Sequence, residues 1–163
     1  MSSRIKTLAD ALKTALNAAS FRESISAAVI WRPRFKVDDL DSLHVTVTPL
    51  TTGRAKARKR VTRIHRDGTV EMLVAVQQRI ATAGGINETR LAELVELTEE
   101  IFDFADGGSD GRALALTIDG GDGKAECVNP TWPALYDLDQ LDGNLCFSSA
   151  VILPFRELLD LED

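Results

Sequence analysis

The chain has 163 residues, of which 44% are hydrophobic and 27% are charged, and its formal net charge is −6. This length suits one domain over residues 1–163, and the composition is that of an ordinary globular protein. Because the overall balance is acidic, the molecule as a whole is not attracted to DNA or to an anionic membrane, and only a local basic patch can bind either.

The first predicted element is a helix over residues 4–18, where apolar side chains recur at helical spacing. Alternation of apolar and polar residues then predicts a strand over residues 21–31. The apolar side of this strand carries Ile25, Ala27, Val29 and Trp31. Pro33 ends it, because proline donates no hydrogen bond to a ladder.

Two further stretches predict strands. Residues 44–50, "HVTVTPL", are short and β-branched, with Val45 and Val47 pointing inward. Residues 62–65 and 69–80 predict a hairpin, since "RDG" between them supplies the positive φ that a tight turn requires. One face of its second arm carries Val70, Met72, Val74 and Val76.

A second helix is predicted from the cap residue Asn87 to about residue 105. Its apolar stripe consists of Leu91, Leu94, Val95, Thr98, Ile101 and Phe102. Its opposite face is acidic and carries Glu88, Glu93, Glu96, Glu99, Glu100 and Asp103.

The remaining sequence predicts three strands. "ALALTI" and "KAECVNP" flank an Asp-Gly turn, "TWPALYDLDQLDGN" reads as an irregular crossing, and "LCFSSAVILPF" alternates as a last strand before the acidic tail at 157–163. We therefore predict an α+β fold, a mostly antiparallel β-sheet packed against two α-helices, with a long basic loop or hairpin at about 53–66.

We find no pattern that predicts catalysis, a cofactor or a metal. His44 and His65 fall in predicted strands without a nucleophile or metal-ligand spacing nearby. The "DGGSDG" and "DGGDG" stretches lack EF-hand and phosphate-loop spacing, and the two cysteines form no CxxC pair, so we expect small, half-buried thiols. No stretch is apolar enough to cross a bilayer, and the first 20 residues lack the apolar run of a signal peptide. We expect a non-enzymatic protein made in a cytoplasm-like compartment.

The most unusual segment is "GRAKARKRVTRIHRDG", residues 53–68, which holds seven Lys and Arg. It can be a solvated loop, a nucleic-acid-binding arm or a basic segment that meets another protein. Nucleic-acid binding would benefit from aromatic side chains for stacking, and this segment has none. Separated basic and acidic regions suit contact between protein copies. The candidate partner-interface residues are Arg54, Lys56, Arg58, Lys59, Arg60, Arg63 and Arg66 of the basic stretch and Glu96, Glu99 and Glu100 of the second helix.

The order of these segments resembles the phage tail terminator family over about residues 4–156. The pieces are the helix "IKTLADALKTALNA", an L-x-V-x-V-x-P strand, a strand ending in "VEMLVAVQQRI", the Leu- and Glu-rich helix "LAELVELTEEIFDFADG", and a closing strand. The matching positions are Leu43, Val45, Val47 and Pro49, then Leu73, Val74, Ala75, Val76 and Gln77, and then Leu94, Val95, Glu96 and Ile101. The sequence departs from the family at "SSAVILPFRELLDLED" and in the charge of its basic stretch.

The resemblance implies a structural virion protein of the tail and neck, made in the host bacterial cytoplasm. It implies a hexameric ring that caps the major tail-tube protein, stops tube polymerisation and offers a surface to a head-completion or stopper protein. Genomic DNA would pass through the lumen without specific binding, and no membrane is involved. Two alternatives stay open, a head-completion (stopper) protein and a nucleic-acid-binding module that uses residues 53–66.

Overall fold

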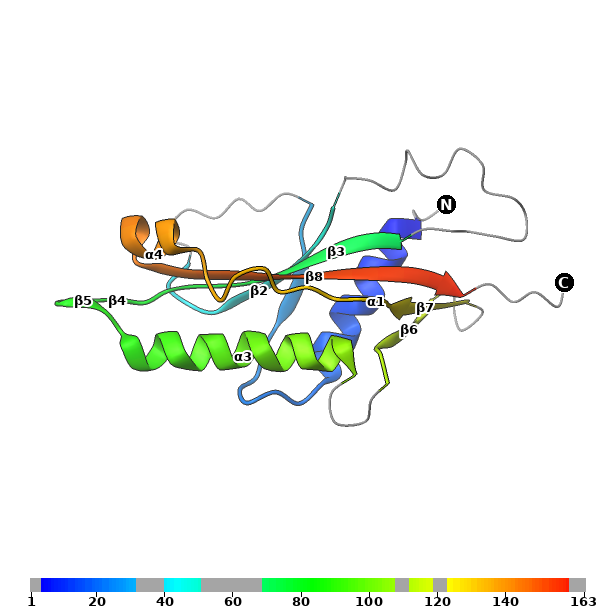
Figure 1. Cartoon of the computed structure of the whole chain (residues 1–163), viewed down its shortest axis with the longest axis horizontal. Coiled ribbons are helices and arrows are strands. Elements are labelled where there is room, and N and C mark those ends of the chain that lie inside the picture. Colours follow the sequence, from blue (N-terminus) through cyan, green and yellow to red (C-terminus); the bar gives the residue numbers. More distant parts are fainter. Residues whose placement is uncertain (1–3, 32–39, 51–68, 108–111, 119–122, 159–163) are drawn as a thin grey trace, which may run out of the picture.

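A computed structural model describes five stretches of the chain, residues 4–31, 40–50, 69–107, 112–118 and 123–158. The main sheet in them consists of β1 (Ala27–Val29), β2 (His44–Pro49), β3 (Thr69–Arg79), β6 (Ala115–Ile118), β7 (Gly123–Cys127) and β8 (Cys146–Leu158). Its strand order is β1-β2-β3-β8-β7-β6 (Figure 1). The β1–β2 pair is parallel and the other pairs are antiparallel, which confirms the predicted mostly antiparallel sheet.

The long axis of the molecule follows β3 and β8. These strands pair without interruption, from Thr69 opposite Arg156 to Arg79 opposite Cys146. Alternation puts one apolar face of both strands into the core, as the sequence predicts. The buried residues of this face are Val70, Met72, Val74, Val76, Phe147, Ser149, Val151, Leu153 and Phe155. Burial of a large apolar side chain stabilises by about 1.5–3 kcal/mol, so this face holds the sheet on its helices.

Two long helices, α1 (Arg4–Ala18) and α3 (Glu88–Asp106), share one hydrophobic core with this face. α3 runs along the long axis, whereas α1 crosses it steeply (Figure 1). α1 contacts β1 and β2 at one side of the sheet and also β6 at the other, so the sheet curls around it. Both helices lie where the sequence predicts helices.

Local hydrogen bonds set the ends of α3. The Asn87 side chain accepts a bond of 3.0 Å from the Arg90 amide, as a helix N-cap does. The helix ends at Gly107, whose amide donates to the Asp103 carbonyl at 3.0 Å and whose φ is 113°. Along the helix, Leu97 is fully buried although it lies outside the predicted stripe.

Replacing Gly107 tests this helix end. A Cβ atom at position 107 would lie 2.8 Å from the backbone of Arg112, at a φ that residues with side chains rarely adopt. We expect Gly107→Ala to lower the free energy of unfolding by about 1–2 kcal/mol. Gly84→Ala is the matched control, because nothing lies within 4 Å of its added Cβ. Equal denaturation midpoints for the two variants would contradict this prediction.

The predicted strand over residues 21–31 is wrong for most of its length. Only Ala27–Val29 forms a strand, and Trp31 is 54% exposed. The side chain of Asn17, near the end of α1, accepts a 2.7 Å hydrogen bond from the Ala27 amide. The ladder therefore begins at Ala27. Upstream, Phe21 packs edge-on against Phe104 of α3, with ring centroids 5.6 Å apart.

The expected irregular crossing before β8 contains a short helix, α4 (Leu138–Asn144). The Asp137 side chain caps it by accepting from the Gln140 amide at 3.1 Å. Only Leu141 of this helix is buried, so the sequence shows no apolar periodicity from which the helix could be predicted. Residues 81–86, between the predicted strand and the second helix, form a small hairpin of β4 (Ala81–Thr82) and β5 (Gly85–Ile86). The predicted arm at 62–65 lies outside the described residues.

Candidate interaction surfaces

The basic stretch Arg54–Arg66, with its seven candidate partner-interface residues, lies outside the described residues, but its attachment points are described. On one side the chain leaves β2 at Leu50, whose amide donates to the Glu71 carbonyl at 2.9 Å. On the other side the chain enters β3 at Thr69, opposite Arg156 of β8. Both attachments therefore lie toward the end of β3 that is farther from α4 (Figure 1).

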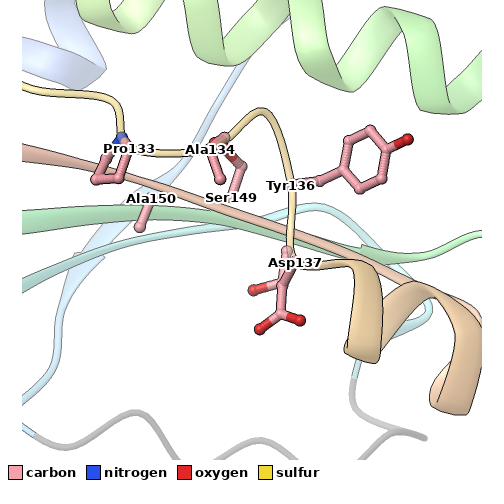
Figure 2. Close-up of a pocket in the computed structure, with 7 residues that line it drawn as sticks. Pro133, Ala134, Tyr136, Asp137, Ser149 and Ala150 are labelled. Atoms are coloured by element: carbon pink, nitrogen blue, oxygen red, sulfur yellow. Dashed lines mark hydrogen bonds between the residues drawn. The ribbon is translucent and has the colours of Figure 1, made fainter.

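At the α4 end of the sheet, the chain before α4 runs along the edge of β8 and leaves a hollow of about 310 Å³. The Asp137 amide donates to the Ser148 carbonyl at 2.8 Å and holds this segment to the strand. In Figure 2, Tyr136 points toward α3, whereas Asp137 points to the other side of the sheet. The hollow is lined by Pro133, Ala134, Tyr136, Asp137, Ser148, Ser149 and Ala150. Small and apolar side chains thus form most of its wall.

Beside this hollow lies an exposed surface that we call the α4 ridge, made of Leu135, Leu138, Asp139 and Asp142. Its leucines are 55% and 58% exposed, and its two aspartates are also exposed. The sequence has no Lys or Arg between Lys124 and Arg156. The ridge is therefore apolar and acidic, and residues 125–155 supply no Lys or Arg that could neutralise its charge.

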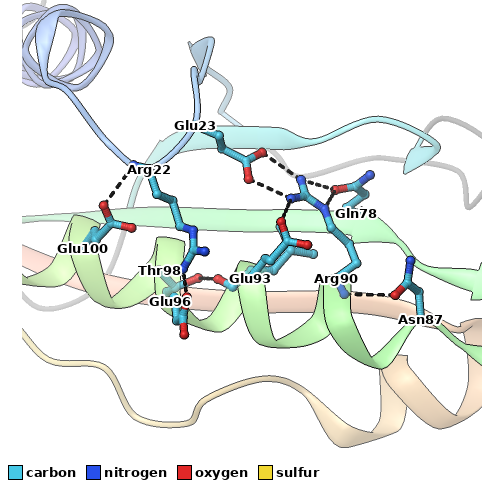
Figure 3. A network of polar contacts seen from close by, with 10 residues as sticks. Arg22, Glu23, Gln78, Asn87, Arg90, Glu93, Glu96, Thr98 and Glu100 are labelled. Carbon is cyan, nitrogen blue, oxygen red and sulfur yellow. Dashed lines mark hydrogen bonds and ion pairs between the residues drawn. The ribbon is translucent and has the colours of Figure 1, made fainter.

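A network of polar contacts centred on Arg90 connects α3 to the segment before β1 (Figure 3). The Arg90 guanidinium donates to both carboxylate oxygens of Glu23, at 2.7 and 2.8 Å. It also donates to the side-chain amide oxygen of Gln78 in β3, at 2.8 and 3.0 Å, and lies 3.5 Å from the Glu93 carboxylate. Because the Arg90 hydrogen bonds favour the charged carboxylate, they lower the pKa of Glu23 below its ordinary value of 4.5. This pair stays ionised at neutral pH and holds the segment before β1 to α3.

The predicted acidic face of α3 contacts the same segment before β1. Glu96 forms an ion pair with the Arg22 guanidinium, and Glu100 accepts a 2.9 Å hydrogen bond from the Arg22 amide. Glu99 is exposed. Two of the three glutamates predicted for a partner interface therefore hold a segment of their own chain. The structure brings these two together around Arg22.

Sequence reasoning missed the residues that form this network and the α4 ridge. Arg22, Glu23 and Arg90 are common surface residues, and Glu23 lies 67 positions from Arg90. No local pattern joins residues so far apart. The α4 ridge did leave a signal, because three leucines and three aspartates follow "TWPA" with no basic residue nearby.

The remaining candidate groups are the two cysteines and the two histidines. Both cysteines are free and buried, instead of half-buried as expected. Burial raises the pKa of Cys127 to about 12 and also raises that of Cys146. His44 lies in β2, and His65 is outside the described residues. Within the described stretches, no three His, Cys, Asp or Glu side chains are grouped to hold a metal ion.

Among the described helices, none is long and apolar enough to cross a membrane. We compared the chain with protein-family models, with curated proteins and with solved structures, and none of them matches it.

Proposed function

We propose that this chain is the subunit of a phage tail terminator. In this function, six copies close into a ring on the end of the tail tube, stop its polymerisation and present a joining surface to a head-completion protein. The proposal rests on the family resemblance in the order of segments, from the first helix to the closing strand. The α+β fold supplies a compact subunit for such a ring.

The observation that carries the proposal is the separation of opposite charges along the long axis of the subunit. The basic stretch is attached where β2 ends and β3 begins, and the acidic α4 ridge lies at the other end of the β3–β8 pair. A head-to-tail contact between identical subunits needs two different complementary surfaces, and it closes into a ring when the rotation between neighbours permits. The basic stretch and the α4 ridge are two such candidate surfaces at opposite ends, and the acidic tail at 157–163 follows β8 at the end of the basic stretch.

The function needs no catalytic group. Many weak contacts, repeated around a ring, add up through effective concentration when the tube presents the same symmetry. DNA has to slide through the lumen, and clustered arginines on the lumen wall would hold its phosphates. A basic stretch that is occupied by contacts between subunits is compatible with this passage.

The test is to examine the purified protein by negative-stain electron microscopy and native mass spectrometry, alone and with the major tail-tube protein encoded in the same genome. We expect six-fold rings, or caps on shortened tubes, that withstand moderate salt. Rings that bind the head-completion surface but ignore tubes would replace this proposal with the stopper function. A monomer that ignores tubes and binds DNA at low salt would instead make the basic stretch a nucleic-acid site.

A further inference from the structure

The exposed side chains of the α4 ridge lie outside the core cluster, whereas Tyr136 of the adjacent hollow packs against it. We propose that the ridge and the hollow form a socket for the basic stretch Arg54–Arg66 of a second copy of this chain. The inference rests on the proposed function, because it names the contact by which neighbouring subunits join. It differs from the sequence-based expectation, which placed the acidic partner surface on α3.

The chemistry of the socket suits a segment that is both basic and partly apolar. Asp139 and Asp142 offer carboxylates to guanidinium groups, which bind them through charge-assisted hydrogen bonds. Leu135 and Leu138, more than half exposed, offer apolar surface to the aliphatic stems of Arg and Lys. The basic stretch also contains Val61 and Ile64 between its cations, and the hollow has a mostly small, apolar wall.

Competition within the chain favours the α4 ridge over α3. On α3, Arg22 already engages both Glu96 and Glu100, so an incoming cation would have to displace it. At the end of β3, opposite the start of β8, the Arg79 guanidinium lies 3.8 Å from the Asp41 carboxylate. No ion pair is described for Asp139 or Asp142 within the described stretches. These two carboxylates are therefore more available than Glu96 and Glu100 of α3.

The length of the chain between β2 and β3 limits which cations can reach the hollow of their own subunit. Along β3, the lining residues Ser148 to Ala150 pair with Gln77 to Ala75, which are eight to six residues from Thr69, or about 27 to 20 Å. Arg66 precedes Thr69 by three residues, so a fully extended chain carries it at most about 10 Å from Thr69. Arg66 therefore falls short of the hollow of its own subunit, whereas a neighbour placed head to tail can present the whole basic stretch.

A binding assay tests the socket directly. The probe is a fluorescent synthetic peptide of residues 53–68, and the receptor is the full-length chain with the seven Lys and Arg of the basic stretch changed to Gln. We expect the fluorescence anisotropy of the peptide to rise with receptor concentration and the affinity to fall as salt increases. Asp139→Lys with Asp142→Lys should weaken binding at least tenfold, and Leu135→Ser with Leu138→Ser at least threefold.

The matched control is Glu99→Lys with Asp103→Lys, which reverses two exposed carboxylates on α3. We expect less than a twofold change in affinity, and circular dichroism verifies the folding of every variant. A larger loss in this control than in the α4 variant would overturn the inference in favour of α3. So would the absence of peptide binding, including the case in which the peptide binds only duplex DNA.

Assembly of the intact chain separates this inference from the proposed function. Six-fold rings that persist unchanged with Asp139→Lys and Asp142→Lys would keep the function and overturn the socket. Peptide binding at the α4 ridge, without rings or capped tubes, would overturn the function and keep the socket. If Lys59→Glu with Arg60→Glu restores assembly to the α4 charge-reversal variant, the two segments are in contact and both proposals are supported.

Discussion

Phe147→Ala is expected to lower the free energy of unfolding by about 3–5 kcal/mol, the largest effect of any single change proposed for this chain. Phe147 is fully buried near the start of β8, opposite Gln78 of β3, and its ring centroid lies 6.2 Å from that of Tyr136. Truncation removes this apolar surface from the core and leaves a cavity that β8, held by its long ladder to β3, cannot easily close. Such a loss is a large part of the about 5–15 kcal/mol that stabilises a typical domain.

Denaturant titration followed by circular dichroism measures this loss. Phe147→Leu should cost less than half as much, since most of the volume remains. Leu138→Ala is the exposed control and should change stability by no more than about 0.5 kcal/mol, because Leu138 is 58% exposed. Similar losses for Phe147→Ala and Leu138→Ala would show that the assignment of the core face of β8 is wrong.

Arg90→Ala has the second largest expected effect, a loss of about 2–3 kcal/mol at neutral pH. The change deletes the two hydrogen bonds to Glu23 and those to Gln78, in a site where the Arg90 and Glu23 side chains are 20% and 27% exposed. Arg90→Lys should recover less than half of the loss, because an ammonium group cannot donate in the planar fork that the carboxylate accepts.

The same pair predicts a pH dependence. The folded-state pKa of Glu23 lies below 4.5, so its stabilising contribution is complete above about pH 4.5 and is lost as the pH falls through the lowered folded value. Arg90→Ala should reduce the loss of stability that occurs as the pH falls. Asp10→Asn, which breaks the exposed Lys6–Asp10 pair at 3.0 Å, should change stability by less than about 0.5 kcal/mol. If Arg90→Ala matches the wild type in both stability and acid sensitivity, the network does not hold the segment before β1.

The long periodic elements could be predicted because their signal is local. The helix from Asn87 and the alternation of Val70 to Val76 each recur over many residues, so one period dominates. Short elements failed for the opposite reason. α4 buries a single residue, and β4 and β5 have two residues each, so neither pattern repeats. The strand expected from Phe21 failed because tertiary contacts to α3 replaced the ladder.

The candidate surfaces were predicted less well. The negative face of α3 is a real feature of the sequence, but the partner of Glu96 proved to be Arg22 of the same chain. A charge pattern in the sequence identifies the carboxylates, but it does not identify the cation with which each of them pairs. The α4 ridge needed the fold, since only the path of the chain along β8 puts Leu135 and Leu138 on the outside of a hollow.

The position of β8 also bears on how the protein is made. β8 lies between β3 and β7 in the sheet, yet it follows every other strand in the chain. Before it is synthesised, β1-β2-β3 and β7-β6 are separate pieces, and the residues that β8 pairs with on β3 are 67 to 87 positions away. Contacts between such distant positions form slowly, because a large loop must close first. The ribosome must therefore deliver nearly the whole described chain before the core can close, and until then both half-sheets depend on protection from aggregation.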